Sequence, residues 1–177
     1  MLKKYRALRE SNSSEWFTPK IYVDAAREVL GGIDLDPASC EAANEIVQAT
    51  KIFTKEDNGL AQAWGGRVWL NPPYGGMSGP FTQKLISHYL DGNVSKAILL
   101  LNSNATDTKW FRPLWDYMLC FTNHRIKFLS PPGTKKSNST HGNVFVYFGP
   151  DEEKFGIIFQ KFGAVVKKWN AWEYYVP

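Results

Sequence analysis

Apolar residues recur along the chain at two spacings, and these spacings predict alternating helices and strands. Between residues 18 and 32 they recur every three to four positions, which is typical of an amphipathic helix. Thr18 is the expected N-cap of this helix and Pro19 its first helical residue, while Gly31 and Gly32 are expected to end it. The first regular element of the chain is therefore predicted to be a helix.

The remaining elements follow from the same patterns. Ser39 is expected to cap a helix that runs to Val47, and further helices are expected at residues 79–92 and 152–161. Short apolar runs between the helices predict strands. These runs are "GIDLD" (32–36), "KIFT" (51–54), "GRVWLN" (66–71), "KAILLLN" (96–102), "MLCFTNHRIKFL" (118–129), "NVFVYFG" (143–149) and "AVVKKW" (164–169).

The alternation of strands with helices predicts an α/β fold with a mostly parallel sheet flanked by helices. With 177 residues, the chain is long enough for one sizeable core and too short for two comfortable domains. We therefore expect a single domain over residues 15–177. A flexible basic arm is expected at residues 1–14, and a long polar loop at residues 130–143.

The composition narrows the class of protein. Lys and Arg number 21 against 17 Asp and Glu, and this net charge of +4 favours a polyanionic partner only slightly. Seven Trp contribute to an aromatic content of 15%, and aromatic planes can stack on bases. Cys40 and Cys120 lack the spacing of a zinc site, so no metal is expected. Because no stretch resembles a signal peptide or a membrane span, we expect a cytoplasmic protein.

Two of the predicted strands end in polar residues that suit ligand binding. In an open parallel sheet, ligands bind outside the carboxyl ends of the strands. The run "IDLD" contains Asp34 and Asp36, and "VWLNPPY" ends in the segment from Asn71 to Tyr74. If the two strands are parallel neighbours, we expect these residues to share one rim of the sheet. A simpler interpretation is that "NPPY" forms a surface turn and "DLDPAS" a helix-capping turn.

The residues of "NPPY" suit the chemistry of an amine conjugated to a ring. The side-chain oxygen of Asn71 and the carbonyl oxygen of Pro72 are both acceptors, and consecutive prolines, Pro72 and Pro73, restrict the turn that carries them. An amine that donates both hydrogens to this pair has its lone pair drawn out of conjugation and directed at an electrophile. Tyr74 can lie flat against the ring and hold it in line.

The electrophile that best suits such a weak nucleophile is a methyl sulfonium, which needs no metal and leaves as a neutral thioether. A cofactor of this kind carries the reactivity while the protein supplies placement. We therefore expect S-adenosylmethionine as the cofactor. Asp34 and Asp36 are candidates to accept from its amino group and its ribose hydroxyls.

At these residues the chain resembles the amino-methyltransferases that use S-adenosylmethionine, and more closely the small phage-type DNA adenine-N6 methyltransferases. The resemblance covers most of the chain beyond the N-terminal arm. It implies a Rossmann-like methyltransferase fold that flips an adenine out of double-stranded DNA and methylates its exocyclic amine, in the host cytoplasm if the protein is phage-encoded. The matching segments are "EWFTPK", "GGIDLDPAS", "AAN", "EDNGL", "WGGRVWLNPPYG", "RIKFLSP" and "NVFVYFG".

The resemblance also implies roles for individual residues. It makes the segment from Asn71 to Tyr74 the catalytic tetrapeptide, and it makes Asp57 the acceptor for the adenine amine of the cofactor. The segment that contains Thr18 would lie beside the methionine part of the cofactor. The loop after the first strand would also contact the cofactor, although the family more commonly has a glycine-rich loop there. The implied cofactor residues are Trp16, Thr18, Pro19, Asp34, Asp36, Pro37, Ala38 and Asp57.

No separate target-recognition domain is expected, so specificity is expected to come from loops such as residues 75–79 and 130–143. Basic residues in or near loops are the candidates for contacts to DNA phosphates, and the protein is expected to act as a monomer or weak dimer. The candidate phosphate contacts are Lys109, Arg125, Lys135 and Lys136, with Arg112 and Lys127 extending the same surface.

Two alternatives stay open at the level of sequence. The same acceptor pair would suit the N4 amine of cytosine, an RNA base or a protein glutamine amide, and only the family resemblance favours adenine. A protein of a different class, a nucleic-acid-binding module that has lost catalysis, would keep the fold. The presence of both Asn71 and Tyr74 argues against that second alternative.

Overall fold

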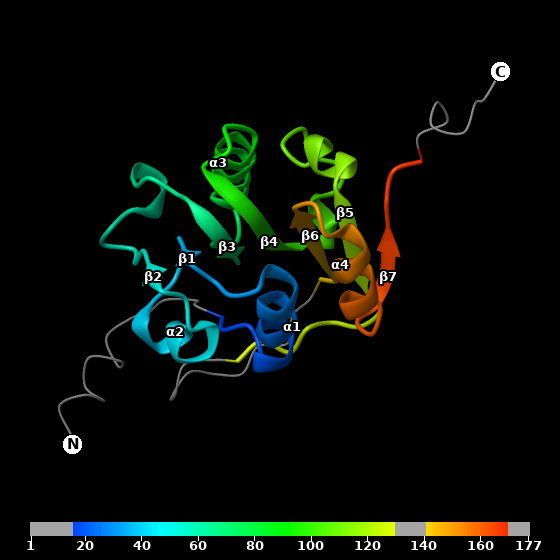
Figure 1. The fold of residues 1–177 in the computed structure, drawn as a ribbon, viewed down its shortest axis with the longest axis horizontal. Helices are drawn as coiled ribbons and strands as arrows, with labels where there is room; N and C mark the ends of the chain where they lie inside the picture. The colour runs from blue at the N-terminus through cyan, green and yellow to red at the C-terminus, as the bar shows by residue number, and fades with distance from the viewer. Residues whose placement is uncertain (1–15, 130–140, 170–177) are drawn as a thin grey trace.

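The computed structural model describes residues 16–129 and 141–169, in which seven strands form one sheet with helices on both faces (Figure 1). The strand order is β2-β1-β3-β4-β6-β5-β7. The strands are β1 (Leu35–Asp36), β2 (Lys51–Ile52), β3 (Gly66–Leu70), β4 (Val94–Asn102), β5 (Met118–Thr122), β6 (Asn143–Phe148) and β7 (Gly163–Val166). The helices are α1 (Lys20–Leu30), α2 (Glu41–Val47), α3 (Ser78–Leu90) and α4 (Glu152–Phe159), with single 3-10 turns η2 (Gly59–Ala61), η3 (Ser103–Ala105) and η4 (Arg112–Asp116).

The sheet is mostly parallel, as the sequence predicts, but two strands reverse direction. β1 pairs in parallel with β2 and β3, and β3 pairs in parallel with β4. β6 is antiparallel to both β4 and β5, so β5 runs in the same direction as β4, and β7 is antiparallel to β5. Five of the seven strands, β1 to β5, therefore share one direction.

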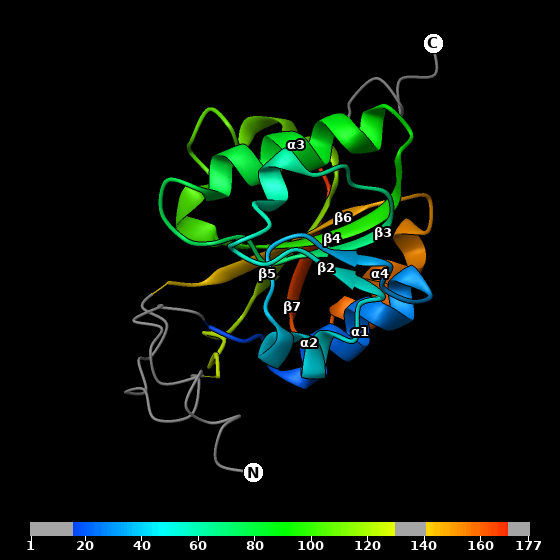
Figure 2. The same cartoon turned by 90° about the vertical axis from the view of Figure 1, so that its left-hand side faces the viewer.

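Helices cover both faces of the sheet, which gives three layers. Figure 2 shows α3 on one face and α1, α2 and α4 on the other. Successive side chains of β4 alternate between the two layers, because neighbouring residues of a strand point to opposite faces. Ile98 and Leu100 belong to the core shared with α1 and α4, whereas Leu99 and Leu101 belong to the core shared with α3. This two-sided burial explains the uninterrupted apolar run in β4.

The predicted helix caps are one residue out of place. Helix α1 has Pro19 as its N-cap and no side-chain capping bond, so the prediction that Thr18 caps this helix is wrong. Thr18 is buried instead and bonds elsewhere, as described below. Helix α2 is capped by Cys40, whose sulfur accepts from the backbone N–H of Ala43 at 3.5 Å, rather than by Ser39.

The predicted strand 32–36 contributes only Leu35–Asp36 to the sheet, and two further predicted strands are also much shorter in the structure. The run 51–54 contributes only Lys51–Ile52 to the sheet, and the run 118–129 contributes only Met118–Thr122. The second strand ends because the Thr122 hydroxyl donates to the His124 carbonyl at 2.7 Å, which turns the chain out of the sheet. Residues 123–129 therefore form a connection at the rim, in which Ile126 is buried in the core and the other side chains are exposed or half-buried.

Some predictions concern parts of the chain that cannot be compared with the structure. The expected arm at residues 1–14 and most of the expected loop at 130–143 lie outside the described residues. Within the described ranges, no helix has the length and apolar character required to cross a membrane.

Candidate active site

The candidate site lies at the carboxyl ends of the strands that share one direction. The chain leaves β1 at residue 37, β3 at residue 71, β4 at residue 103 and β5 at residue 123. These connections emerge at the same edge of the sheet because the strands run in the same direction. Residues 16–18 also reach this edge, since Phe17 and Leu129 bond each other's backbone at 2.9 and 2.8 Å. The sheet topology therefore brings five separate segments of the chain to one rim.

Asn71 follows β3 directly and presents a buried acceptor without a partner. Its side-chain nitrogen Nδ2 donates to Thr18 Oγ1 at 3.3 Å. Its side-chain oxygen Oδ1 is buried and has no hydrogen-bond partner within the described part of the chain. An unpaired buried acceptor is unfavourable by about 1–3 kcal/mol, so it is uncommon in a folded protein without a functional reason. The atom is well suited to accept a hydrogen bond from a ligand.

The two prolines after Asn71 are held by the first turn of α3. Ser78 is only 8% exposed, and its hydroxyl donates to the Pro73 carbonyl oxygen at 3.1 Å. This bond uses the Pro73 carbonyl and leaves the Pro72 carbonyl as the second acceptor of the predicted pair. Together with the restricted φ angles of the two prolines, the bond makes the turn rigid. Sequence reasoning did not identify the role of Ser78.

Tyr74 completes the tetrapeptide and is largely buried. Its hydroxyl is buried without a partner among the described residues, and burial raises the pKa of this phenol, so it stays neutral at physiological pH. Its ring meets the edge of Phe128, with ring centroids 6.1 Å apart and an interplanar angle of 76°. Phe128 comes from the connection after β5, and the sequence analysis did not single it out. Two unpartnered polar atoms, Asn71 Oδ1 and the Tyr74 hydroxyl, thus occur within one tetrapeptide.

Asp36 ends β1, the neighbour of β3, and it is the buried carboxylate of the rim. The register pairs Leu35 with Val68, so Asp36 lies level with Trp69, two residues before Asn71. Asp36 is 3% exposed, and this burial raises its pKa to about 7. The backbone N–H of Ala38 donates to it at 3.2 Å, and this bond, with the Ser39 hydroxyl, opposes the rise in pKa.

Asp34, by contrast, lies at the other end of β1 and is already paired. Its carboxylate accepts from Arg67 Nη2 at 2.6 Å, and from Arg67 Nε and the Arg67 backbone N–H at 2.8 Å each. Arg67 lies four residues before Asn71, which corresponds to about 13 Å along a strand. The hydrogen bonds from Arg67 lower the pKa of Asp34 and keep it ionised. The expectation that Asp34 shares the rim with Asp36 and Asn71 is therefore wrong.

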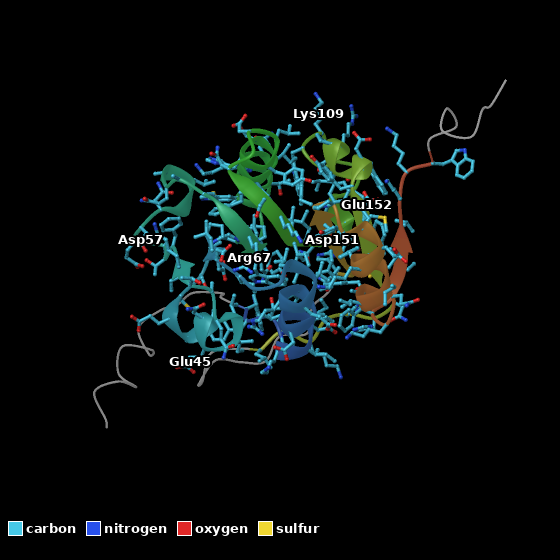
Figure 3. All side chains as sticks on the ribbon, viewed as in Figure 1. Glu45, Asp57, Arg67, Lys109, Asp151 and Glu152 are labelled. Atoms are coloured by element: carbon cyan, nitrogen blue, oxygen red, sulfur yellow. The ribbon has the colours of Figure 1, made fainter. Side chains whose placement is uncertain are left out.

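Asp57 lies in an exposed turn between β2 and η2. Its Oδ2 accepts from the backbone N–H of Thr54 at 2.8 Å and from the Thr54 hydroxyl at 2.9 Å, and these bonds lower its pKa. The turn packs closely against the rim at Gly59. The backbone of Gly59 lies so near the carbonyl oxygen of Pro37 that a Cβ at this position would overlap it. Figure 3 shows Asp57 beside β2, at an edge of the molecule. The turn thus packs against the loop that follows Asp36.

The other residues predicted to contact the cofactor also lie along this rim. Pro37 is buried, and Ala38 is half-buried and donates to Asp36. Trp16 and Pro19 are half-buried on either side of the bridge between Phe17 and Leu129. The structure therefore brings together, at one edge of the sheet, Trp16, Thr18, Pro19, Asp36, Pro37, Ala38 and the tetrapeptide at 71–74.

The predicted phosphate contacts are distributed over two connections. Lys109 follows β4 and Arg125 follows β5, and both side chains are exposed. Lys109 and Asp57 lie well apart in Figure 3. Arg112 and Lys127 are exposed as well, whereas Lys135 and Lys136 lie outside the described residues.

Asn102 and Asn143, which the sequence analysis did not identify, bond each other and support the connection that follows β5. Asn143 is 1% exposed; its Nδ2 donates to Asn102 Oδ1 at 3.3 Å, and its Oδ1 accepts from the backbone N–H of Ile126 at 3.4 Å. These bonds connect the end of β4 and the start of β6 with the segment that carries Phe128. The available signal was an asparagine at the end of the apolar run 96–102 and another at the start of the apolar run 143–149.

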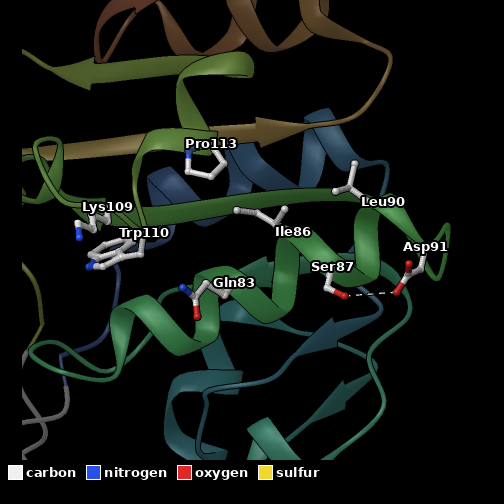
Figure 4. A pocket seen from close by; sticks show the side chains of 8 residues that line it. All are labelled: Gln83, Ile86, Ser87, Leu90, Asp91, Lys109, Trp110 and Pro113. Carbon is white, nitrogen blue, oxygen red and sulfur yellow. Dashed lines mark hydrogen bonds between the residues drawn. The ribbon is translucent and has the colours of Figure 1, made fainter.

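A hollow lies between α3 and the connection that follows β4. It runs along the helix toward Leu90 and Asp91, with Lys109 and Trp110 at its other end (Figure 4). The described ranges contain no cluster of His, Cys, Asp or Glu side chains that could hold a metal ion. The chemistry of the rim is therefore that of neutral acceptors, one buried carboxylate and aromatic rings.

The fold and the rim define a Rossmann-like α/β protein with a ligand site at the carboxyl ends of β1 and β3. A comparison with curated proteins gave no match. The family model described as DNA N-6-adenine-methyltransferase (Dam) matches residues 6–170, nearly the whole chain. The protein belongs to this family, which confirms the resemblance inferred from the sequence and supports its assignment as a methyltransferase that acts on DNA.

Proposed function

We propose that the protein transfers a methyl group from S-adenosylmethionine to the N6 amine of an adenine flipped out of double-stranded DNA. The observation that carries this proposal is the side-chain oxygen of Asn71, a buried acceptor at the carboxyl end of β3 that has no partner among the described residues. A flipped adenine presents a donor amine that would satisfy it. Asp36, on the adjacent strand, supplies a carboxylate for the cofactor next to that acceptor.

The chain's part in the reaction is to orient the amine. Asn71 Oδ1 and the Pro72 carbonyl oxygen would each accept one amine hydrogen, which directs the nitrogen lone pair away from the base ring. The turn is rigid because of its prolines and the bond from Ser78, so the acceptors need little reorganisation during the reaction. No general base is needed, because the methylated nitrogen can release its proton after the transfer.

The residues along the rim fit the proposed cofactor. S-adenosylmethionine, when bound, supplies an electrophilic methyl group on a sulfonium. The carboxylate of Asp36 suits its ribose hydroxyls or its cationic amino group, and Asp57 keeps one carboxylate oxygen beyond the bonds to Thr54 for an adenine amine. Trp16, Pro19 and the backbone of Thr18 would pack beside the methionine part, while the Thr18 hydroxyl is bonded to Asn71. Asp34 is omitted from the proposed contacts because Arg67 occupies it.

Stacking of the flipped adenine on the ring of Tyr74 would offset part of the free energy needed to take the base out of the duplex. Base flipping costs a few kcal/mol, and stacking of one base on an aromatic ring returns about 1–3 kcal/mol. The exposed cations Lys109 and Arg125 would bind phosphates on the connections after β4 and β5, with Lys135 and Lys136 proposed for the same role. These phosphate contacts would hold the duplex in place but would not read its sequence.

The test is a direct analysis of the product. Purified protein is incubated with unmethylated plasmid DNA and S-adenosylmethionine that carries an isotopically labelled methyl group, and the DNA is digested to nucleosides for mass spectrometry. The proposal predicts labelled N6-methyldeoxyadenosine. The matched control is Asn71→Ala, which keeps the cofactor contacts and lacks the acceptor.

Other outcomes would overturn specific parts of the proposal. Labelled N4-methyldeoxycytidine would show that the methylated base is cytosine and not adenine. Label in added RNA or in protein, and not in DNA, would show that the proposed substrate class is wrong. DNA binding without labelled product, in both the wild type and the variant, would identify a binding module without catalysis.

A further inference from the structure

We propose that Thr18 is a positioning residue for the reaction, and that its hydroxyl holds the amide of Asn71 with the oxygen facing the substrate amine. This inference deepens the proposed function and rests on it. The family resemblance implies a contact between the Thr18 segment and the cofactor, whereas the structure shows the hydroxyl bonded to the side chain of Asn71. The role proposed here acts on the acceptor of the base.

The bond between these residues is partly buried and joins two distant parts of the sequence. Asn71 Nδ2 donates to Thr18 Oγ1 at 3.3 Å across a separation of 53 residues. Thr18 is only 6% exposed, so water has little access to replace its hydroxyl. The same residue is followed by Pro19, the N-cap of α1, and preceded by Phe17, whose backbone pairs with Leu129. The backbone that carries the hydroxyl is therefore held on both sides of Thr18.

The orientation of the amide decides whether the amine can be bound. An asparagine side chain has an acceptor oxygen and a donor NH2 of nearly equal size, and rotation by half a turn exchanges them. With Oδ1 toward the substrate, the amine finds an acceptor; with Nδ2 in that place, two donors would face each other. In the orientation observed, Thr18 accepts from Nδ2 while Oδ1 stays without a partner. That is the arrangement that receives an amine.

Loss of the Thr18 hydroxyl would remove this support. Nδ2 would become a buried donor without a partner among the described residues, and the amide would lose the bond that favours the observed orientation over the rotated one. An aspartate at position 71 has two equivalent oxygens, so it presents an acceptor in either orientation. The need for Thr18 should therefore depend on whether residue 71 is an amide or a carboxylate.

The experiment compares Thr18→Val, which keeps the shape, with Thr18→Ser, which keeps the hydroxyl. Single-turnover methyl transfer and the Kd for S-adenosylmethionine are measured for each variant, and melting temperatures check that each is folded. Thr18→Val is expected to slow the transfer by about 10-fold, the effect of losing one neutral hydrogen bond, with the Kd changed by less than about 3-fold. Thr18→Ser is expected to recover most of the rate.

The same pair is then measured with Asn71→Asp. In that background, Thr18→Val is expected to change the rate by less than about 3-fold, because no amide orientation remains to be lost. If Asn71→Asp is itself inactive, the serine and valine variants at position 18 decide the question by their rates and Kd values alone. If Thr18→Val does not fold, Thr18→Ala replaces it in every comparison.

Three results would overturn the inference while leaving the proposed function intact. They are a Thr18→Val protein with the wild-type rate, a loss of rate that follows an equal loss of cofactor affinity, or a Thr18→Ser protein as slow as Thr18→Val. A wild-type protein without methyl transfer would instead contradict the proposed function itself.

Discussion

The guanidinium of Arg67 and the carboxylate of Asp34 form a two-pronged ion pair at the amino ends of β3 and β1, with Nη2–Oδ1 and Nε–Oδ2 distances of 2.6 and 2.8 Å. The backbone N–H of Arg67 donates to the same carboxylate, and Nη1 donates to the carbonyl oxygen of Gly31. The pair joins the end of α1 to the first residues of two strands. The two aspartates of "DLD" therefore have different roles: Asp34 is part of this structural ion pair, whereas Asp36 lies at the rim.

Asp34→Asn should lower stability without removing methyl transfer. The two side chains of the pair are 35% and 38% exposed, so solvent screening limits the loss to about 1 kcal/mol. Because the pKa of Asp34 is lowered in the folded state, the stabilisation is present above the unfolded value of 3.8 and is lost as pH falls through the lower folded value. Urea unfolding of the wild type and variant between neutral and acidic pH measures this difference. If Asp34→Asn is as stable as the wild type but no longer binds the cofactor, Asp34 is a cofactor contact after all.

Asp36 should make cofactor binding depend on pH. Burial raises its pKa to about 7, so in the folded protein without cofactor the carboxyl group is mostly protonated below about pH 7. Because the folded pKa is higher than the unfolded value of 3.8, the stability of the fold decreases as the pH rises from 3.8 toward about 7. The charged form is the better acceptor for the cofactor. Affinity should therefore increase by about 10-fold from about pH 6 to about pH 8, as the carboxylate ionises. Calorimetric titration measures this change, and Asp36→Asn, which has no charge to gain, should abolish that slope.

Asn71→Ala should separate chemistry from cofactor binding. Removal of the acceptor amide is expected to slow methyl transfer by at least about 100-fold, the effect of losing a preorganised group that acts on the reacting centre. The Kd for S-adenosylmethionine should stay close to the wild-type value, because the proposed cofactor contacts come from other segments. Rapid-quench assays and equilibrium binding measure the two quantities. A variant with near wild-type turnover would contradict the proposed acceptor pair.

Gly59→Ala should lower the stability of the fold by disrupting the packing between the Asp57 turn and the loop after Asp36. Its Cβ would overlap the carbonyl oxygen of Pro37, so the backbone must shift at a cost of about 1–3 kcal/mol. The shift should also weaken cofactor binding, since Pro37 follows Asp36. The control is Gly156→Ala in α4, where a Cβ would meet its nearest neighbour, Met118, at 3.9 Å. That substitution should leave stability equal or raise it by about 1 kcal/mol, as thermal unfolding will show.

Arg125→Ala should weaken DNA binding and leave cofactor affinity unchanged. Loss of one phosphate contact is expected to reduce the salt dependence of DNA binding, the slope of log K against log[salt], by about 1. Lys154→Ala, an exposed cation in α4, is the matched control and should leave the slope unchanged, because α4 follows β6, which ends at the opposite edge of the sheet. Fluorescence anisotropy with a labelled duplex at several salt concentrations measures the slopes. Equal slopes for Arg125→Ala and the wild type would place the duplex elsewhere.

Local patterns in the sequence were sufficient for the type of each helix and strand, and they drew attention to the tetrapeptide that is proposed to be catalytic. The continuous apolar run of β4 identified a strand buried on both faces, and "NPPY" after an apolar run identified a strand end with two acceptors. These features depend on neighbouring residues, so periodicity and turn chemistry reveal them. The exact starts of α1 and α2 were missed by one residue, because caps depend on backbone geometry that the flanking residues only partly specify.

The partners of the site residues were decided by the tertiary structure alone. Asp34 and Asp36 are two residues apart and chemically identical, yet the register of β1 against β3 pairs one with Arg67 and buries the other at the rim. Thr18 looked like a helix cap in the sequence and became the partner of Asn71. Sequence alone determined which groups the protein possesses and which strands they follow. Their contacts required strand order and register, which arise from packing between residues far apart in the chain.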